Sequence, residues 1–242
     1  MGESAFDRAF ADIEASRDVE SLRAAMTRMI ETYGLAHAVY HALRLPNDPR
    51  ENPVVIHSYP VEWIERYRSK RYFEFDPIVL SAARSIIPVD WERIDISAPR
   101  AQALFREAHD FGIDQRGLTV PIRGHRGDLA IFTVTSSLQP AEWRRRKLSY
   151  MRDMQLLGNY VHQRVLGMSG DEAAPEVALS QREQQCLQWA AAGATITVTA
   201  DKVGLSERAV RGYLDSARHK LSSLTKAQAV ARAINLGIVQ PR

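Results

Sequence analysis

Tyr59, Trp63, Tyr67 and Asp76 place three aromatic rings with polar ends and one carboxylate within a short stretch of the chain. An indole N–H only donates hydrogen bonds, an ionised carboxylate only accepts them, and a phenol does both, so this set can pair with the polar atoms of a small molecule. Ordinary interpretations compete with this one. Aromatic residues four apart on a helix commonly pack in a core, and Asp76 followed by proline is typical of a turn or helix start.

A second group of side chains places positive charge on a predicted helix over residues 206–220, which carries a net charge of +2. The cations expected on its exposed surface are Arg208, Arg211, Arg218 and Lys220. A guanidinium can bond the edge of a guanine through two atoms, whereas a lysine suits a phosphate. Because surface charge is routine, a solvated helix face is the competing interpretation.

The residue types that most often perform catalysis are not arranged for it. The sequence contains no His-x-x-x-Asp metal cluster, no Gly-x-Ser-x-Gly turn and no phosphate-binding glycine loop. His37, His41 and His57 are scattered, and Cys186 is the single cysteine, which excludes an intrachain disulfide and a multi-cysteine metal site. We therefore predict no catalytic residue, no metal and no cofactor, in a chain suited to the reducing cytoplasm.

The distribution of charge divides the chain of 242 residues, 45% of which are apolar. Residues 167–176 contain Gly, Ser, Pro and acids without apolar periodicity, which predicts a linker between domains over residues 1–166 and 177–242. From residue 175 onward, nine basic and five acidic residues give +4, whereas the 23 basic and 24 acidic residues before it give −1. The small basic domain therefore fits a polyanionic partner. No apolar run approaches the ~18 residues of a membrane span, so no membrane partner is expected.

The first domain mixes helices and strands. The helices predicted from apolar spacing and end signals are residues 5–13, 22–33, 63–71, 99–111 and 141–165. The predicted strands are residues 35–45, 54–56, 117–123 and 129–135. Pro46-Asn47-Asp48-Pro49 predicts a turn, Gly124-His125-Arg126-Gly127 a hairpin loop, and Ser97 with Pro99 a helix start. We expect an α+β fold, an α/β/α sandwich whose antiparallel sheet can enclose a cavity beneath its helices.

The second domain is predicted to be all helix. Ser180-Gln181-Arg182-Glu183 is a capping box, and Ser206 and Thr225 can cap later helices. A helix over residues 196–203 turns at Gly204 into the basic helix, which is the arrangement of a helix-turn-helix. Every residue of the segment Thr195–Thr199 is β-branched, and such residues disfavour a helix. The segment therefore predicts a short or marginal first helix.

Both domains resemble one family, the LuxR-type regulators. The residues similar to its DNA-binding module are Leu179-Ser180-Gln181-Arg182-Glu183, Leu187, Gly193, Ala200, Leu205-Ser206 and Val210. The residues similar to its autoinducer-binding domain, with the spacing of the TraR-like branch, are 59–67, Asp76-Pro77, Trp91, 111–113, 117–122 and Phe132-Thr133. The resemblance spans nearly the whole chain. It implies a cytoplasmic quorum-sensing transcription factor, usually a dimer, that responds to an N-acyl-homoserine lactone.

The resemblance also implies which side chains bind the lactone. Trp63 would donate to the lactone carbonyl, Asp76 would accept from the amide N–H, and Tyr59 would donate to the acyl carbonyl. The further implied contacts are apolar ring faces from Tyr67 and Trp91 and a water-mediated reach from Thr133 to a 3-substituent.

On the DNA side, the resemblance implies that Arg211 reads a base. Arg208 reads a base or holds a phosphate, and Lys202, Ser206 and Lys220 complete the expected DNA-binding set. Asp215 departs from the family pattern, because it stands where the same branch has a second base-contacting arginine. The half-site sequence therefore does not transfer.

The leading hypothesis is a sensor that binds lactone and, as a homodimer, a pseudo-palindromic double-stranded DNA site, with RNA polymerase as a partner if it activates. Asp215 and the 195–199 segment motivate an alternative, an orphan regulator or anti-activator that pairs with another LuxR-type protein and binds DNA weakly. A lactone hydrolase is the enzymatic alternative. An apolar stripe also has two interpretations, packing on its own sheet or a dimer contact; it comprises Leu148, Met151, Met154, Gly158, Val161 and Val165.

Overall fold

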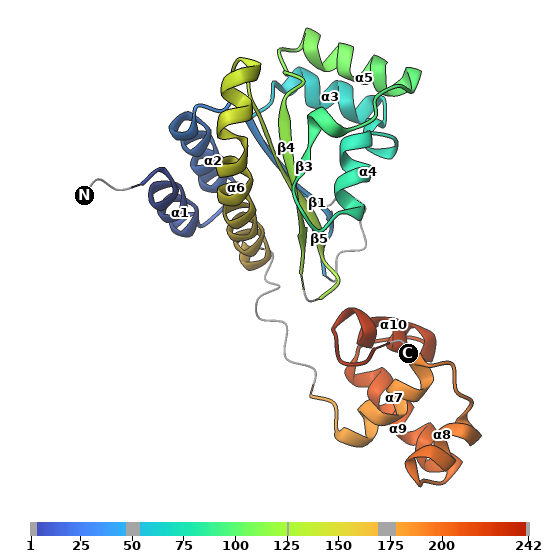
Figure 1. Cartoon of the computed structure of the whole chain (residues 1–242). Coiled ribbons are helices and arrows are strands. Elements are labelled where there is room, and N and C mark those ends of the chain that lie inside the picture. The colour runs from blue at the N-terminus through green and yellow to red at the C-terminus, as the bar shows by residue number, and fades with distance from the viewer. Residues whose placement is uncertain (1–3, 47–53, 125, 169–177, 241–242) are drawn as a thin grey trace. The chain divides into compact units, whose positions relative to one another are not determined.

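The computed structural model describes residues 4–46, 54–124, 126–168 and 178–240, which belong to two compact units. The N-terminal unit is an α/β/α sandwich and the C-terminal unit is helical, so the predicted α+β fold is confirmed (Figure 1). Gly167 and Met168, predicted to begin a linker, instead continue the last helix of the first unit. The rest of the predicted linker, residues 169–176, lies outside the described residues, as do most of the predicted turn at 46–49 and His125. None of the described helices is both long and apolar enough to cross a membrane.

One antiparallel sheet organises the N-terminal unit, with strand order β2-β1-β5-β4-β3. The strands are β1 (His37–Arg44), β2 (Val54–His57), β3 (Val89–Asp90), β4 (Gly117–Arg123) and β5 (Leu129–Thr135). The predicted hairpin is confirmed, since β4 pairs with β5 from Gly117 opposite Thr135 to Arg123 opposite Leu129. Almost every residue of β4 and β5 is buried, because helices cover both faces of the sheet.

One face of the sheet forms a continuous hydrophobic core with its helices. It is covered by α1 (Ala5–Ala15), α2 (Val19–Tyr33) and α6 (Pro140–Met168), as Figure 1 shows. Phe132 points to this face, and a Cβ built on Gly158 of α6 would lie 2.9 Å from the Phe132 Cβ, so the glycine allows the helix to approach the sheet. Met154, Val161 and Val165 are buried in the same core, which confirms the packing interpretation for these members of the α6 stripe, whereas Leu148 is exposed.

Three other helices cover the opposite face. They are α3 (Val61–Ser69), α4 (Pro77–Arg84) and α5 (Pro99–Asp110), with single 3-10 turns η1 (Tyr72–Glu74) and η2 (Trp91–Arg93). Neither α4 nor β3 was predicted from the sequence. The predicted helix over residues 63–71 ends earlier, because Arg71 adopts a left-handed backbone with φ 52°. Pro99 begins α5 as predicted, but Ala98 occupies the cap position and supplies no side-chain hydrogen bond, so Ser97 is not the cap.

The C-terminal unit packs four described helices around its own core. They are α7 (Gln181–Ala191), α8 (Ile196–Val203), α9 (Glu207–Lys220) and α10 (Lys226–Asn235). The capping box of Ser180 and Glu183 forms in both directions. The β-branched segment forms a full helix, α8, because the Thr195 hydroxyl accepts from the Val198 N–H and the helix packs on its neighbours. The first helix of the motif is short, as predicted, with eight residues that form a regular helix.

Candidate functional site

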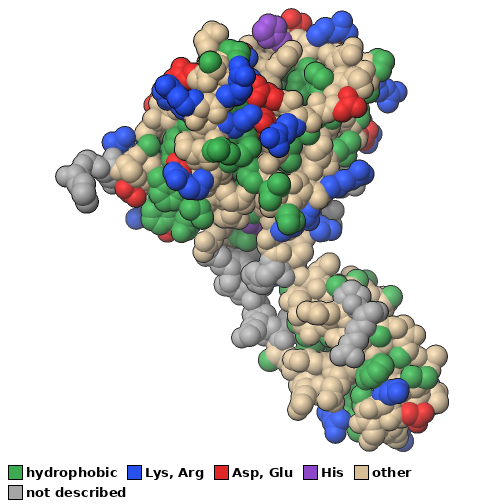
Figure 2. All heavy atoms as spheres, in the orientation of Figure 1, with side chains coloured by type: hydrophobic (Ala, Val, Ile, Leu, Met, Phe, Trp, Pro, Cys, Tyr) green, Lys and Arg blue, Asp and Glu red, His purple; other side chains and the backbone are tan. Residues whose placement is uncertain are grey.

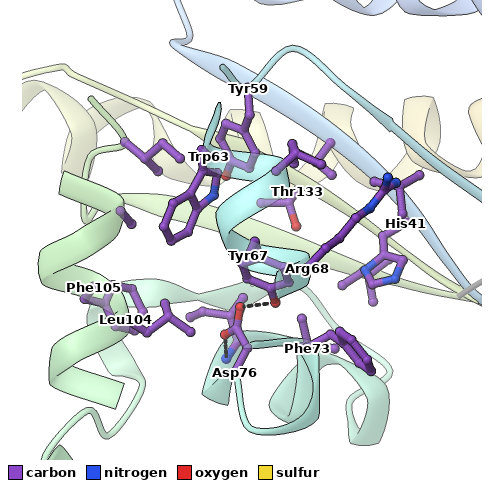
Figure 3. A pocket seen from close by; sticks show the side chains of 18 of the residues that line it. His41, Tyr59, Trp63, Tyr67, Arg68, Phe73, Asp76, Leu104, Phe105 and Thr133 are labelled. Carbon is purple, nitrogen blue, oxygen red and sulfur yellow. Dashed lines mark hydrogen bonds between the residues drawn. The ribbon is translucent and has the colours of Figure 1, made fainter. Parts of the chain in front are cut away.

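A cavity of about 410 Å³ lies between the sheet and the helices α3, α4 and α5 of the N-terminal unit (Figure 3). The sheet supplies Val39, His41, Ile131 and Thr133, which alternate along β1 and β5 with residues that point to the hydrophobic core on the other face. Most of its lining is apolar or aromatic, with a few polar groups that face inward. Such a chamber suits a small molecule with one apolar part and a few hydrogen-bonding atoms.

All six side chains predicted to bind ligand line this cavity. They are Tyr59, Trp63, Tyr67, Asp76, Trp91 and Thr133. Helix α3 presents Trp63 and Tyr67 four residues apart, and Asp76 caps α4 by accepting from the Ile78 N–H at 2.8 Å. The structure thus brings together residues from four segments of the chain. Trp63 and Tyr67 pack within the core and Asp76 caps a helix, as the ordinary interpretations predicted, and all three also line the cavity.

Asp76 is a buried carboxylate without a cation at hydrogen-bond distance among the described residues. Its second oxygen accepts from the Tyr67 hydroxyl at 2.7 Å, which Figure 3 shows as a dashed line. Burial raises the pKa of Asp76, and the hydrogen bonds from Tyr67 and Ile78 offset only part of that effect. Burial, followed by the charge of Asp76, raises the pKa of Tyr67, so the phenol stays protonated and donates. A carboxylate has about four acceptor positions, so Asp76 retains capacity for a further donor.

Two donors at the cavity have no partner within the described part of the chain. Trp63 is only 3% exposed, yet its indole N–H makes no hydrogen bond to a described residue. The hydroxyl of the half-buried Tyr59 likewise makes no hydrogen bond to a described residue, and burial raises the pKa of this phenol, so it stays a neutral donor. A polar group left unpaired away from water costs about 1–3 kcal/mol, so these donors favour a ligand that carries acceptors.

Trp91 and Thr133 belong to one chain of hydrogen bonds across the sheet. The Trp91 indole N–H donates to the Thr119 hydroxyl at 2.9 Å, and the Thr119 and Thr133 hydroxyl oxygens are 2.9 Å apart. Because its N–H is engaged, Trp91 offers the cavity its ring face. A Cβ on Gly117 would lie 2.8 Å from that ring, so only glycine leaves room for the indole on β4.

Helix α5 is held over the cavity by two contacts outside it. The Arg66 guanidinium makes a bidentate ion pair with Glu107, at 2.7 and 3.1 Å, which joins α3 to α5. The Arg100 guanidinium lies 5.8 Å from the centre of the Phe75 ring. These contacts keep Leu104 and Phe105 on the cavity wall.

Sequence reasoning missed several residues of the cavity. His41, Arg68, Phe73 and Phe105 line it, and Thr119 positions two of its side chains. Strand alternation could have pointed to His41, which lies two residues after Val39 on β1. Arg68 carries a weaker signal, because it follows the cavity residue Tyr67 but precedes the exposed polar residues at the end of α3.

The scattered histidines do not gather into a metal site. Within the described residues, no group of three or more His, Cys, Asp or Glu side chains could hold a metal ion. Burial lowers the pKa of His37 and of His57, whose ring nitrogens face backbone carbonyls at 3.3 and 3.2 Å.

In the C-terminal unit, α9 presents a polar face beside its buried stripe of Val210, Leu214 and Ala217. Arg208 and Arg211 are exposed on it, and Arg211 forms an exposed ion pair with Glu207 at 3.3 Å. Asp215, one turn after Arg211, is also exposed and lies 3.8 Å from the Arg218 guanidinium. Basic and acidic side chains are also intermixed on the visible face of the N-terminal unit (Figure 2).

The other three predicted DNA contacts differ in how they are engaged. Lys202 is exposed, with its ammonium 6.0 Å from the Trp189 ring centre. The Ser206 hydroxyl caps α9 by accepting from the Ala209 N–H. Lys220 donates to the buried carboxylate of Glu183 at 2.8 Å, so part of its charge serves the fold of this unit.

A sheet-and-helix unit with a small-molecule cavity, joined in one chain to a helix-turn-helix unit, defines a ligand-responsive transcription regulator. Comparison with known families agrees. Residues 18–165 match the autoinducer binding domain, and residues 177–233 match the bacterial regulatory proteins of the luxR family. The chain belongs to the LuxR family of quorum-sensing transcription regulators.

Individual relatives cover most of the chain. The transcriptional activator protein RaiR of Rhizobium etli is 38% identical over 73% of this chain and 74% of its own. AhyR of Aeromonas hydrophila, also a transcriptional activator, is 27% identical over 87% of this chain and 83% of its own. Among solved structures, Escherichia coli SdiA shares the fold with a TM-score of 0.69 at 20% identity over 94% of both chains. The N-acylhomoserine-lactone-dependent factor CepR2 of Burkholderia cenocepacia has a TM-score of 0.55 at 20% identity, over 69% of this chain and 96% of its own.

Proposed function

We propose that the cavity binds an N-acyl-homoserine lactone. The observation that carries the proposal is the set of polar groups in a mostly apolar chamber: two unpaired donors, Trp63 and Tyr59, and a buried carboxylate without a cation, Asp76. A homoserine lactone amide presents two carbonyl groups and one N–H, so each group finds a partner of opposite kind. Trp63 donates to the lactone carbonyl, Tyr59 to the acyl carbonyl, and Asp76 accepts from the amide.

The apolar walls complete the proposed ligand contact. Tyr67 and Trp91 face the ring and the first part of the acyl chain, and Thr133 reaches a 3-substituent through water. In either direction of the Thr119–Thr133 hydrogen bond, the Thr133 hydroxyl retains a position for a ligand or water.

Titration calorimetry of the purified chain with hexanoyl, octanoyl and decanoyl homoserine lactones tests this proposal. Trp63→Phe removes the indole donor while keeping an aromatic ring, and we expect affinity to fall by about tenfold or more. Phe105→Leu, which changes the wall and no polar group, serves as the control for altered packing. Binding of no lactone by the wild-type chain, or equal binding by Trp63→Phe, would contradict the proposal.

We propose that the C-terminal unit binds a pseudo-palindromic DNA site as a homodimer, with α9 in the major groove. Arg211 would read a base edge, Arg208 a base or a phosphate, and Lys202, Ser206 and Lys220 would contribute at the backbone. The exposure of Arg208 and Arg211 supports these assignments. Lactone would act by favouring the dimer competent for DNA, in the cytoplasm, with RNA polymerase as a further partner if the protein activates.

Gel shifts with a palindromic operator, with and without lactone, test the DNA proposal. We expect Arg211→Ala to abolish preference for operator over scrambled DNA while retaining salt-dependent nonspecific binding. Unchanged operator preference in Arg211→Ala would remove the base-reading role from this residue.

Asp215 supports a second candidate, an orphan regulator or anti-activator that heterodimerises and binds DNA weakly. An exposed carboxylate one turn from Arg211 opposes phosphate and base-edge contacts on the same helix face. The formation of α8 removes the other observation that motivated this candidate. If Asp215→Asn alone converts a nonbinding homodimer into an operator-binding one, the second candidate is favoured.

We also propose that the chain binds lactone without turning it over. Incubation with an acyl-homoserine lactone followed by mass spectrometry tests for catalysis directly. Multiple turnovers of lactone to ring-opened acid would contradict a purely sensory role.

A further inference from the structure

The cavity has a polar end that a plain alkyl chain does not require. Arg68 and His41 both line it, and Figure 3 shows their side chains reaching toward the same region, away from Leu104 and Phe105. Arg68 comes from the last turns of α3 and His41 from β1, so two separate elements place hydrogen-bonding groups there. The side of the cavity that holds Asp76 and Trp63 already contains the partners proposed for the lactone amide and carbonyls.

Arg68 differs from its neighbour Arg66, although both are on α3. The Arg66 guanidinium is bound by Glu107 through two hydrogen bonds. The Arg68 guanidinium has no ion pair or hydrogen bond with any residue in the described ranges. Asp76, an acid of the cavity wall, has its oxygens bonded to Tyr67 and Ile78. The donors of Arg68 are therefore available at the cavity.

The exposure of Arg68 determines which end group of a ligand can bind beside it. The residue is exposed, so this end of the cavity meets solvent and an end group placed there stays partly hydrated. Partial hydration lowers the cost of bringing in an anion, and the planar guanidinium matches a carboxylate through two parallel hydrogen bonds. His41, 8% exposed, adds an imidazole at the same end. The alternative interpretation is that Arg68 lays its apolar stem along the cavity wall and extends its guanidinium into water, in which case it would not select between ligands.

We propose that Arg68 and His41 form a polar subsite that selects acyl-homoserine lactones whose acyl chain ends in a hydrogen-bond-accepting oxygen group, with a carboxylate bound best. This inference rests on the proposed binding of an acyl-homoserine lactone in the cavity. It names Arg68 as the specificity-determining residue.

Matched ligands test the subsite with the wild-type full-length chain alone. Calorimetry compares octanoyl homoserine lactone with analogues of equal chain length that end in a carboxylate, a hydroxyl or an ammonium group. We expect the carboxylate analogue to bind about tenfold more tightly than the octanoyl compound, the ratio typical of one hydrogen bond to a charged group. The hydroxyl analogue should bind between them, and the ammonium analogue most weakly because Arg68 repels it.

Variants assign the preference to Arg68. Arg68→Met keeps a flexible stem without the charge and should abolish the preference for carboxylate, whereas Arg68→Lys should retain part of it. Lys70→Met removes an exposed cation from the end of the same helix, away from the cavity wall, and should leave the preference unchanged. Thermal unfolding of each variant checks that its fold is intact.

The outcomes separate this inference from the proposed function. If octanoyl homoserine lactone binds as tightly as the carboxylate analogue or more tightly, the lactone site stands and the polar subsite is overturned. If the preference persists in Arg68→Met, the assignment to Arg68 is overturned. If none of the lactones binds, the proposed function fails and the subsite fails with it.

Discussion

Asp76 and Glu183 are both buried carboxylates, one in each unit, and their surroundings give them opposite properties. Asp76 is bonded to a phenol and to a backbone N–H, and burial raises its pKa. Burial also opposes ionisation of Glu183, but bonds from Lys220, Ser216 and Ser180 outweigh it and lower its pKa to about 2. A carboxylate with a cation and several donors is complete within the fold, whereas one without a cation retains capacity for a ligand.

The largest expected effect is on the stability of the C-terminal unit. Glu183→Ala removes the partner of Lys220 and of the Ser216 hydroxyl and half of the α7 capping box, and we expect a loss of about 3 kcal/mol of unfolding free energy. Hydrogen exchange of the α7 and α9 amides in the full chain measures it. Asp215→Asn, at an exposed carboxylate of α9, is the control and should change exchange little. Slow exchange retained in Glu183→Ala would show that the network is not stabilising.

Asp76→Asn should instead weaken lactone binding. We expect a decrease of roughly tenfold to a hundredfold, because the amide N–H of the ligand loses a charged acceptor. Asp114→Asn, at another acid of the cavity wall, should leave affinity nearly unchanged. Calorimetry measures both variants, and equal affinity in Asp76→Asn and wild type would remove Asp76 from the amide contact.

The two carboxylates also predict pH dependences in different ranges. The stability that Glu183 contributes is present above its unfolded pKa of 4.5 and is lost as pH falls toward its folded pKa of about 2. Lactone binding needs ionised Asp76, whose folded pKa is raised, so affinity should be lost at a higher pH than the folded pKa of about 2 at which the contribution of Glu183 is fully lost. Calorimetry and hydrogen exchange across the acidic range compare the two. Loss of both at the same pH would contradict the assigned surroundings.

The smallest expected effect separates the two lysines predicted to meet DNA. Lys202→Met should reduce the slope of log affinity against log salt by about 1, as expected for one lost phosphate contact. Lys220→Met should change the slope less and the stability more, because Glu183 holds that ammonium. Equal slope changes would mean that Lys220 leaves Glu183 for phosphate when DNA binds.

Local signals explain what could be predicted from the sequence. Helix caps such as Thr195, Ser206 and the Ser180 box act over three residues, and the β4–β5 hairpin follows from alternation around glycines. The six ligand-facing side chains came from family resemblance, and they converge on one cavity. The missed helix α4 begins at Pro77 with a cap from Asp76, a signal that the sequence contains but that an ordinary turn also produces.

By itself, the sequence indicated two domains and a basic helix-turn-helix, and its family resemblance pointed to six side chains for a ligand site. Tertiary structure alone decided that Arg68 and His41 share a cavity end, that Thr119 links Trp91 to Thr133, and that Lys220 holds Glu183 from 37 residues away. The physical reason is range. Capping and alternation depend on neighbours within a few residues, whereas a buried charge takes its properties from whichever distant side chains packing brings beside it.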